Sequence, residues 1–448
     1  MKLFGTDGVR GLANAELTPE LALALGRAAV GVLEREQPGP PLVVVGRDPR
    51  ASGVLLESAL VAGIMSAGGQ ALLAGVLPTP AIAFLTRHYG AAAGAMISAS
   101  HNPMPDNGIK FFGSEGFKLP DVLEERIEAV LPLPDQGAPR PVGAEVGGIR
   151  QAGEAGEAYL AHLLDGARYD LGGLEVVVDC ANGAAATVAP EAYRRAGAWV
   201  TTIGAAPDGH NINHGCGSTH PEHVREAVVR AGAAVGLAHD GDADRLIAVD
   251  EHGELIDGDV ILAIAALDER DQGGLPTATV VTTVMTNLGF RRAMAERGIE
   301  VVQTAVGDRY VLETMRAGGH TLGGEQSGHI IFLDRATTGD GILTGLRLLE
   351  IMARSKLPLS ELAQVMRRMP QVLVNVRVSG RERLDGAEVV WRAVGHEQVR
   401  LGDRGRVLVR ASGTEPLVRV MVEAETADEA RTTADRLARV VGAELGTG

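Results

Sequence analysis

Cysteine, aromatic residues and long apolar segments are all scarce in this sequence. Its 448 residues include two cysteines, Cys180 and Cys216, and only 3% aromatic residues. Two thiols cannot form a disulfide scaffold, which indicates a reducing, cytoplasmic setting. Hydrophobic residues still make up 45% of the chain, so it can bury a large aliphatic core, and its length favours several domains.

No apolar run approaches the roughly 20 residues needed to cross a bilayer, and the N-terminus does not have the pattern of a signal peptide. The net charge of −15 argues against nucleic acid and anionic membrane as partners. Local arginines can still bind small anions. We therefore expect a soluble cytoplasmic protein with no nucleic-acid and no membrane partner.

Lysine is also rare, because only four of the 42 basic residues are lysines: Lys2, Lys110, Lys118 and Lys356. A lysine can lose its proton where its surroundings lower its pKa, whereas an arginine effectively cannot. Lys110 is therefore a candidate proton-transfer residue. The alternative is a chance position on a solvated turn, which composition alone favours.

Short β-branched runs alternate with helical patterns along most of the chain, as at 41–48, 174–185 and 277–287. Uninterrupted apolar strands between helices predict an α/β fold with parallel or mixed sheets. These three blocks resemble one another weakly, which indicates similar modules. Candidate boundaries are a proline-rich stretch, the end of a predicted hairpin and a change to a small α+β pattern, at 132–148, 245–259 and 367–371.

The stretch SASHNPMPDNGIKFF (98–112) predicts a polar loop at the end of a core strand, with Ser100 next to His101. Its prolines and Asn-Gly exclude a regular helix or an interior strand. The pattern is not the G-x-S-x-G of a hydrolase nucleophile. A turn or N-cap serine is the ordinary alternative.

The acidic loop HDGDADR (239–245) places Asp240, Asp242 and Asp244 at alternate positions after an apolar strand. Three carboxylates this close repel one another unless a cation lies among them. Oxygen ligands alone indicate a hard cation, Mg²⁺ or Ca²⁺. An EF-hand is excluded because Arg245 stands where that loop needs glycine. The apolar flanks disfavour a merely solvated acidic turn.

The stretch RASGTEPLVR (410–419) has the composition of a phosphate-binding loop. Guanidinium groups, hydroxyls and backbone N–H groups can together hold a phosphate dianion. An ordinary turn with surface arginines is the alternative. The candidate phosphate ligands are Arg410, Ser412, Gly413, Thr414 and Arg419.

Two further loops are weak signals when taken singly, because plain turns have the same composition. GGEQSGH (323–329) places Glu325 and Ser327 two residues apart, where they can bind adjacent sugar hydroxyls, and GTDGVRG (5–11) presents Arg10 to an anion. A serine that carries a phosphoryl group beside a divalent cation fits all of these loops together.

These five motifs, in this order, resemble the α-D-phosphohexomutase superfamily over essentially the whole chain. Within the superfamily the sequence is most similar to the bacterial phosphoglucosamine mutase branch. The stretches that carry this similarity are GTDGVRG (5–11), DCANGAA (179–185), NINHGCGSTH (211–220), VGDRYV (306–311) and GGEQSGHII (323–331).

The resemblance implies four domains around a central cleft, three of them α/β with related topology and mixed sheets, and a smaller C-terminal α+β domain that closes the cleft by rotation. It also implies interconversion of glucosamine 6-phosphate and glucosamine 1-phosphate, toward UDP-N-acetylglucosamine and peptidoglycan, with a sugar bisphosphate as intermediate and activator. A homodimer is frequent in the family. The expected domains are 1–150 with the phosphoserine loop, 151–252 with the metal loop, 253–368 with the sugar-binding loop and 369–448 with the phosphate-binding loop.

The same resemblance assigns a role to each candidate residue. The roles are phosphoserine for Ser100; Mg²⁺ ligands for Ser100, Asp240, Asp242 and Asp244; charge stabilisation for Arg10 and Arg245; proton transfer for Lys110 first, then His101 and His329; sugar contacts for Glu325 and Ser327; and phosphate contacts for Arg410, Ser412, Gly413, Thr414 and Arg419.

Three alternatives remain open at this point. A phosphomannomutase or phosphoglucomutase shares the chemistry, although the Glu-Gln-Ser-Gly and Asn-Ile-Asn stretches count against it. A non-catalytic sugar-phosphate sensor predicts a damaged Ser100 or acidic loop, and both are intact. A Mg²⁺-dependent phosphatase has no need of a second phosphate-binding loop.

Overall fold

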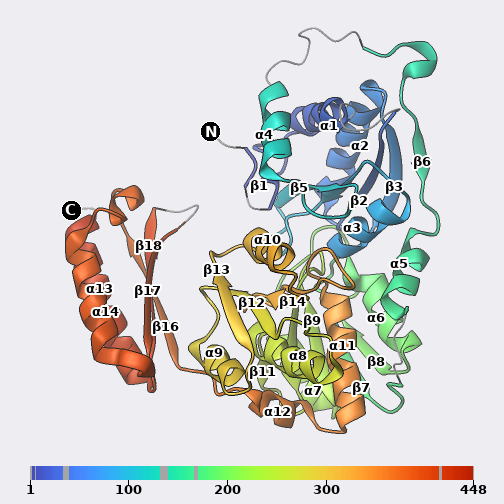
Figure 1. Cartoon of the computed structure of the whole chain (residues 1–448). Helices are drawn as coiled ribbons and strands as arrows, with labels where there is room; N and C mark the ends of the chain where they lie inside the picture. Colours follow the sequence, from blue (N-terminus) through green and yellow to red (C-terminus); the bar gives the residue numbers. More distant parts are fainter. Residues whose placement is uncertain are drawn as a thin grey trace. The chain divides into compact units, whose positions relative to one another are not determined.

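The computed structural model describes residues 3–5, 7–33, 40–131, 140–165, 170–412 and 416–446. The chain forms two compact units, coloured by sequence in Figure 1. The larger unit comprises Met1–Met285 and Glu300–Val365, and the smaller comprises Thr286–Ile299 and Met366–Gly448.

One four-stranded pattern occurs three times in the larger unit. In each sheet one strand has a parallel neighbour on both sides. A fourth strand pairs antiparallel with the outer edge of one of these neighbours. The strands in spatial order are β3 (Gln70–Val76), β2 (Leu42–Arg47), β4 (Ala93–Ile97) and β5 (Asp106–Gly113); β8 (Trp199–Ile203), β7 (Glu175–Asp179), β9 (Val235–His239) and β10 (Leu246–Asp250); and β13 (Glu300–Thr304), β12 (Thr279–Thr283), β14 (Leu322–Gly324) and β15 (Ile330–Phe332).

Two of the sheets have additional edge strands. The first sheet adds β1 (Val9–Leu12) beside β5 and β6 (Ile149–Gln151) beside β3, and the second adds β11 (Leu255–Ile256) beside β10. The boundary predicted at residue 150 falls within β6, and the four domain boundaries remain predictions.

Helices connect the parallel strands, as parallel pairing requires. The connections are α2 (Ala51–Ser66) and α3 (Thr79–His88), α6 (Ala185–Arg195) and α7 (Glu222–Ala231), and α9 (Leu288–Ala295) and α10 (Asp308–Gly318). Of these helices, α9 belongs to the smaller unit. The other helices of the larger unit are α1 (Pro19–Leu33), α4 (Asp121–Val130), α5 (Ala155–Leu164), α8 (Gly258–Gln272), α11 (Gly341–Ser355) and α12 (Leu359–Leu362).

Inner strands of all three sheets are buried on both faces, which explains their uninterrupted apolar sequences. Every residue of β4, β9 and β12 is buried. In the first sheet, Val43 and Val45 belong to the same fully buried aliphatic cluster as Leu60 and Ile64 of α2. Aliphatic packing of this kind needs few aromatic residues, in agreement with the composition.

The smaller unit has a different architecture. Its antiparallel sheet has β18 (Leu417–Glu423) between β16 (Gln371–Arg377) and β17 (Arg406–Ala411), and its long helices are α13 (Glu388–Leu401) and α14 (Ala427–Leu445). Val418, Val420 and Val422 alternate along β18 and are fully buried in one cluster with Leu437 and Val441 of α14. The predicted fold class, three related α/β modules and a smaller α+β module, is confirmed.

Candidate active site

The repeated topology places three of the predicted motifs in equivalent loops. In each α/β sheet, the connection from the last parallel strand to the antiparallel strand carries polar residues: 98–105 between β4 and β5, 240–245 between β9 and β10, and 325–329 between β14 and β15. Ligands of α/β proteins bind outside the carboxyl ends of parallel strands. The three loops therefore occupy the position where such sheets form sites.

Ser100 is held in an unusual backbone conformation inside the first loop. Its φ is 53°, in the left-handed region, and the residue is 1% exposed. A non-glycine residue in this region costs on the order of 1–3 kcal/mol. The Ser100 N–H donates to Ser98 Oγ at 2.9 Å, and the Ser100 hydroxyl donates to Asp240 Oδ2 at 2.7 Å. The predicted serine therefore contacts the predicted acidic loop, although Ser100 and Asp240 are 140 residues apart in the sequence.

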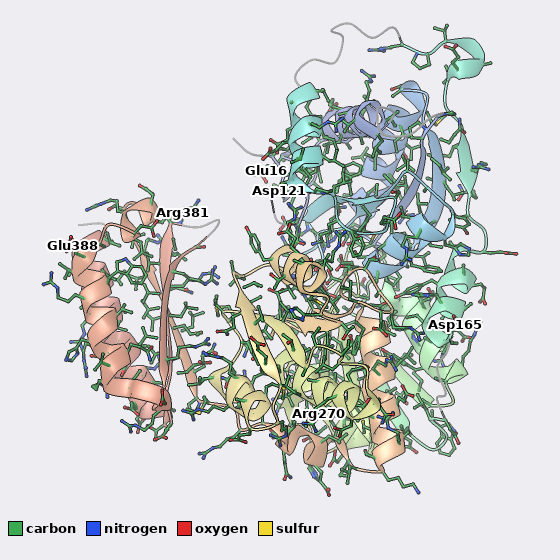
Figure 2. The ribbon with its side chains drawn as sticks, in the orientation of Figure 1. Glu16, Asp121, Asp165, Arg270, Arg381 and Glu388 are labelled. Carbon is green, nitrogen blue, oxygen red and sulfur yellow. The ribbon has the colours of Figure 1, made fainter. Side chains whose placement is uncertain are left out.

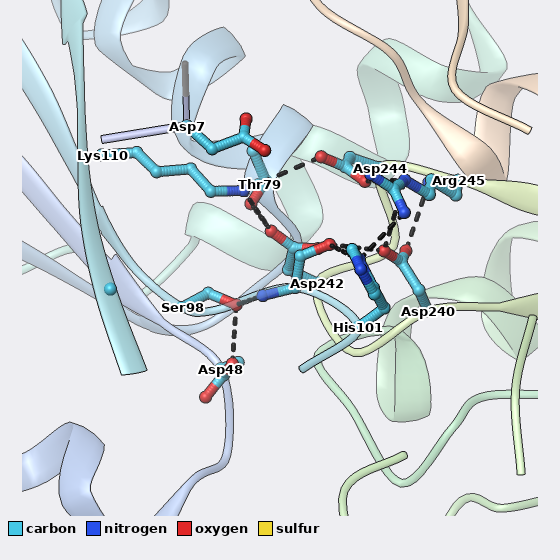
Figure 3. Close-up of polar contacts among 12 residues, drawn as sticks. Asp7, Asp48, Thr79, Ser98, His101, Lys110, Asp240, Asp242, Asp244 and Arg245 are labelled. Atoms are coloured by element: carbon cyan, nitrogen blue, oxygen red, sulfur yellow. Dashed lines mark hydrogen bonds and ion pairs between the residues drawn. The ribbon is translucent and has the colours of Figure 1, made fainter. Parts of the chain in front are cut away.

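The three aspartates of the acidic loop form one buried group (Figure 3). Their ligand oxygens all lie within 4.8 Å of one another. Burial, and then Asp244 and Asp242, raises the pKa of Asp240 well above its usual range. Oδ1 of Asp242 and Oδ1 of Asp244 are buried without a hydrogen-bond partner among the described residues. Buried, unpartnered carboxylate oxygens fit a hard divalent cation.

Lys110 on β5 lies against the same carboxylates. Its Nζ donates to Asp242 Oδ2 at 2.8 Å and lies 3.8 Å from Asp244 Oδ2. Burial alone would lower the pKa of Lys110, but Asp242 and Asp244 outweigh it and raise the pKa. A lysine that accepts a proton at neutral pH needs a lowered pKa. The carboxylates, contributed by a distant loop, reverse that shift, so Lys110 is an ammonium group in this arrangement.

His101 contacts both Ser100 and Arg245. His101 Nδ1 is 3.4 Å from Ser100 Oγ and 2.9 Å from Arg245 Nη1. Burial, and then the charges of Arg245 and Arg10, lowers the pKa of His101 to about 4. The imidazole is therefore neutral at pH 7 and accepts a hydrogen bond from Arg245. Arg10, on β1, forms an ion pair with Asp7 at 3.1 Å.

The third loop brings His329 to the acidic group as well. His329 Nδ1 lies 3.7 Å from Asp244 Oδ2, and the Gly339 N–H donates to Nε2 at 3.1 Å. This pattern places the ring proton on Nδ1, facing Asp244. Burial opposes a charge on His329, but Asp244 and then Asp308 outweigh it and raise the pKa. In return, Lys110 and His329 overcome the effect of burial and hold the pKa of Asp244 well below its usual range.

The predicted sugar contacts lie in this loop with different exposure. Glu325 is half-buried and accepts a hydrogen bond from the Gly307 N–H at 3.2 Å, whereas Ser327 is exposed. Burial raises the pKa of Glu325, although His329 opposes the shift. Both residues remain predicted sugar ligands.

Sequence reasoning missed several residues of this site. Thr79 Oγ1 donates to Asp242 Oδ2 at 2.6 Å. Lys118 Nζ donates to Asp7 Oδ1 at 2.6 Å and to Asp308 Oδ2 at 2.5 Å. The scarcity of lysine was a signal for Lys118, since two of the four lysines follow the serine loop. The partners come from other loops, so no local pattern could identify the pairs.

The predicted phosphate ligands lie in the smaller unit. Arg410 and Arg419 are register partners of β17 and β18. Burial, and then the Arg419 guanidinium, lowers the pKa of Arg410. Arg381, labelled in Figure 2, donates to the Ser412 carbonyl at 2.7 Å. Gly413 and Thr414 lie outside the described residues.

Among the residues that the structure describes, no helix is both long enough and apolar enough to cross a membrane.

Comparison with known families finds four consecutive matches that span nearly the whole chain. Phosphoglucomutase/phosphomannomutase alpha/beta/alpha domains I, II and III match residues 1–135, 157–253 and 257–369, and the C-terminal domain of the same family matches residues 373–440.

Individual relatives agree with these matches. The phosphoglucosamine mutase of Moorella thermoacetica is 56% identical over 440 residues, which is 98% of this chain and 99% of that protein. The phosphoglucosamine mutase of Streptomyces griseus is 58% identical over 450 residues, with 99% and 100% coverage. The crystal structure of a phosphoglucomutase/phosphomannomutase family protein from Burkholderia thailandensis superposes with a TM-score of 0.83 at 26% identity, covering 99% of this chain and 97% of that chain.

Proposed function

The chain belongs to the phosphoglucomutase/phosphomannomutase family, and from this membership we propose that it interconverts glucosamine 6-phosphate and glucosamine 1-phosphate through a phosphoserine at Ser100. The observation that carries the proposal is the position of Ser100 Oγ, 2.7 Å from Asp240 within a group of three buried carboxylates. The names of relatives at 56–58% identity favour the amino sugar over other hexoses.

Mg²⁺ is the proposed cofactor. The ligands available are oxygen atoms only, and Mg²⁺ prefers such ligands while keeping positions for phosphate oxygens. Asp240, Asp242 and Asp244, together with the phosphate on Ser100, would hold the ion. When bound, it would neutralise charge on the phosphoryl group during transfer.

The first transfer moves the phosphoryl group from Ser100 to a sugar hydroxyl. The P–Oγ bond breaks, a P–O bond to the sugar forms, and the proton of the sugar hydroxyl is balanced by one on Oγ. As an ammonium group, Lys110 can supply the proton to Oγ, and His329 would accept one at Nε2 once the Gly339 N–H releases that nitrogen. Arg245 and Arg10 add positive charge where the transferring group is negative.

The bisphosphorylated sugar must then turn round, so that its other phosphate can return to Ser100. Glu325 and Ser327 would bind hydroxyls in both orientations. The non-transferred phosphate would be held by Arg410, Ser412, Gly413, Thr414 and Arg419. Closure against water during this step would protect the intermediate from hydrolysis.

A side-by-side turnover assay tests the proposal. The purified protein, with Mg²⁺ and a trace of glucose 1,6-bisphosphate, is offered the 6-phosphates of glucosamine, glucose and mannose. We measure kcat/KM for each 1-phosphate and the release of inorganic phosphate. We expect preference for glucosamine 6-phosphate and negligible phosphate release.

Each alternative has its own signature in this assay. Preference for mannose 6-phosphate or glucose 6-phosphate would support the phosphoserine chemistry but identify a phosphomannomutase or a phosphoglucomutase. Stoichiometric phosphate release would identify a phosphatase. Binding without turnover of any of the three sugars would identify a sensor.

A further inference from the structure

Arg50, a residue outside the candidate active site, is fully buried beneath the Ser100 loop. Both its side chain and that of Asp48 are 0% exposed, and Arg50 Nε lies 2.9 Å from Asp48 Oδ2. An isolated buried arginine is very unfavourable, so it persists only where a carboxylate and acceptors satisfy it. At Arg50 the other acceptors are all backbone carbonyls of one short loop.

The guanidinium group uses all five of its N–H donors. Nε bonds Asp48, and each terminal nitrogen bonds two carbonyl oxygens at 2.6–3.0 Å. A guanidinium group has no further donor, so no N–H remains for a ligand. The four carbonyl acceptors belong to Ser100, Asn102, Pro103 and Asp106.

Arg50 is also linked to the Ser100 N–H by a chain of hydrogen bonds through Asp48 and Ser98. Asp48 Oδ2 accepts from Ser98 Oγ at 2.6 Å, and Ser98 Oγ accepts from the Ser100 N–H at 2.9 Å, as Figure 3 shows for Asp48 and Ser98. The Ser100 carbonyl is held by Arg50 directly and by Asn213 Nδ2 at 2.9 Å. Both peptide groups of the left-handed residue are therefore held by side chains.

The proposed reaction gives this arrangement a purpose, and the inference rests on that proposal. Return of the phosphoryl group forms the P–Oγ bond, breaks the P–O bond to the sugar and moves the Oγ proton to the sugar oxygen. Oγ must stay in place while the phosphate is absent and the bisphosphorylated sugar turns. An unsupported left-handed serine would relax to a common backbone conformation and move Oγ away.

We propose that Arg50, acting with Asp48 and Ser98, is a positioning residue that keeps Ser100 Oγ in its reactive place while Ser100 is unphosphorylated. Arg50 reaches Ser100 only through backbone groups, and none of its five N–H groups bonds Asp240, Asp242 or Asp244. Loss of this support therefore slows recapture of the phosphoryl group and leaves sugar binding unchanged.

The test uses Arg50→Lys and Ser98→Ala in the full chain. Lysine keeps the charge but has three donors instead of five, and alanine at 98 removes the acceptor of the Ser100 N–H. Arg225→Lys is the matched control, because Arg225 also donates to a backbone carbonyl, that of Gly253 at 2.6 Å. For each protein we measure kcat, KM for glucosamine 6-phosphate, the thermal midpoint and the glucose 1,6-bisphosphate concentration that gives half-maximal activity.

Both test variants should lower kcat by roughly tenfold or more, because misplacement of a reacting group by about 1 Å can cost a hundredfold. They should raise the half-maximal bisphosphate concentration by roughly tenfold, since the unphosphorylated enzyme loses its intermediate before recapture. KM should stay within about twofold of wild type. The control should match wild type in all three kinetic values.

An unchanged bisphosphate requirement in folded Ser98→Ala would overturn the inference, even if Arg50→Lys failed to fold. So would a loss of activity that only follows the loss of folded protein. A wild-type protein without mutase activity would instead refute the proposed function, so the two failures are distinguishable.

Discussion

The loop that carries Ser100 and the strand pair that carries Arg410 differ in how their arginine side chains are paired. Beneath Ser100, the guanidinium of Arg50 is paired with Asp48 and fully used by the protein itself. In the C-terminal sheet, Arg410 and Arg419 face each other in register, and burial and this neighbour lower the pKa of Arg410. Like charges directly opposite in a sheet are destabilising.

This difference separates two kinds of site. All N–H donors of Arg50 are occupied by the chain, so this cation holds the Ser100 loop in one conformation. The proposed phosphoserine chemistry needs such a fixed position. Two cations that repel each other leave favourable energy for an anion that arrives from solution. We expect substitutions in the first region to change kcat and substitutions in the second to change KM.

The largest effect is expected from Ser100→Ala. Without the carrier hydroxyl, mutase activity should fall by roughly a thousandfold or more, because the covalent route is lost. Activity and phosphate incorporation, by intact-protein mass spectrometry, are the measurements. Ser58→Ala, whose hydroxyl bonds the Val54 carbonyl of its own helix, should behave as wild type. Near-normal turnover by Ser100→Ala would remove the phosphoserine from the mechanism.

The next effect concerns the acidic loop. Mg²⁺ should raise the thermal midpoint of wild type, since ligand binding to the folded state stabilises it. Asp242→Asn should abolish this rise and lower activity by roughly a hundredfold. The Mg²⁺-dependent shift is measured by differential scanning fluorimetry. The exposed carboxylate of Asp271 is the control, as Asp271→Asn. A full Mg²⁺ shift in Asp242→Asn would exclude this carboxylate as a ligand.

A smaller effect, of the opposite kind, is expected from Arg410→Gln. Loss of one charge-assisted bond to phosphate should raise KM by roughly ten- to a hundredfold with little change in kcat. The thermal midpoint should not fall, because a repulsion is also removed. Steady-state kinetics beside Arg404→Gln, whose arginine lies 3.8 Å from Glu425, provide the comparison. A fall in kcat alone would contradict the distinction between the two regions.

The smallest effect concerns Asp340, a buried carboxylate held by neutral donors: the Tyr159 hydroxyl and the N–H groups of Ile342 and Leu343. Burial raises its pKa to about 6. The folded state thus holds this proton more tightly than the unfolded state, so wild type loses stability as the pH rises from about 4 to about 6.

Asp340→Asn cannot lose that proton. Its thermal midpoint relative to wild type should rise by a few degrees across the same pH interval, corresponding to about 3 kcal/mol at most. Differential scanning calorimetry between pH 4 and 7 measures the difference. A constant difference across this range would show that Asp340 keeps an ordinary pKa.

Local patterns located the groups of the candidate site where those groups were contiguous in the sequence. Asp240, Asp242 and Asp244 are neighbours on one loop, so their spacing was enough to indicate a cation site. Ser100 was identified by its loop and by family resemblance. The left-handed backbone of Ser100 had no signature, because the turn residues around it fit several conformations.

Residues that act across the chain could not be predicted in this way. Arg50 lies about 50 residues before the carbonyls that it holds, and Lys118 lies 190 residues before Asp308. The raised pKa of Lys110 had no sequence signal for the same reason, since Asp242 comes from 132 residues away. A charge in isolation does not reveal which partner will neutralise it.

The sequence by itself determined the fold class, the three weakly similar modules and the types of functional group, because apolar periodicity and local turn chemistry act over a few residues. Only the tertiary structure decided which groups meet. It brings together the equivalent loops 98–105, 240–245 and 325–329 of the three modules. Because these loops are largely buried, the pKa of each ionisable group depends on its neighbours. Electrostatic energies in a buried site depend on distance in space, and distance in sequence does not specify that.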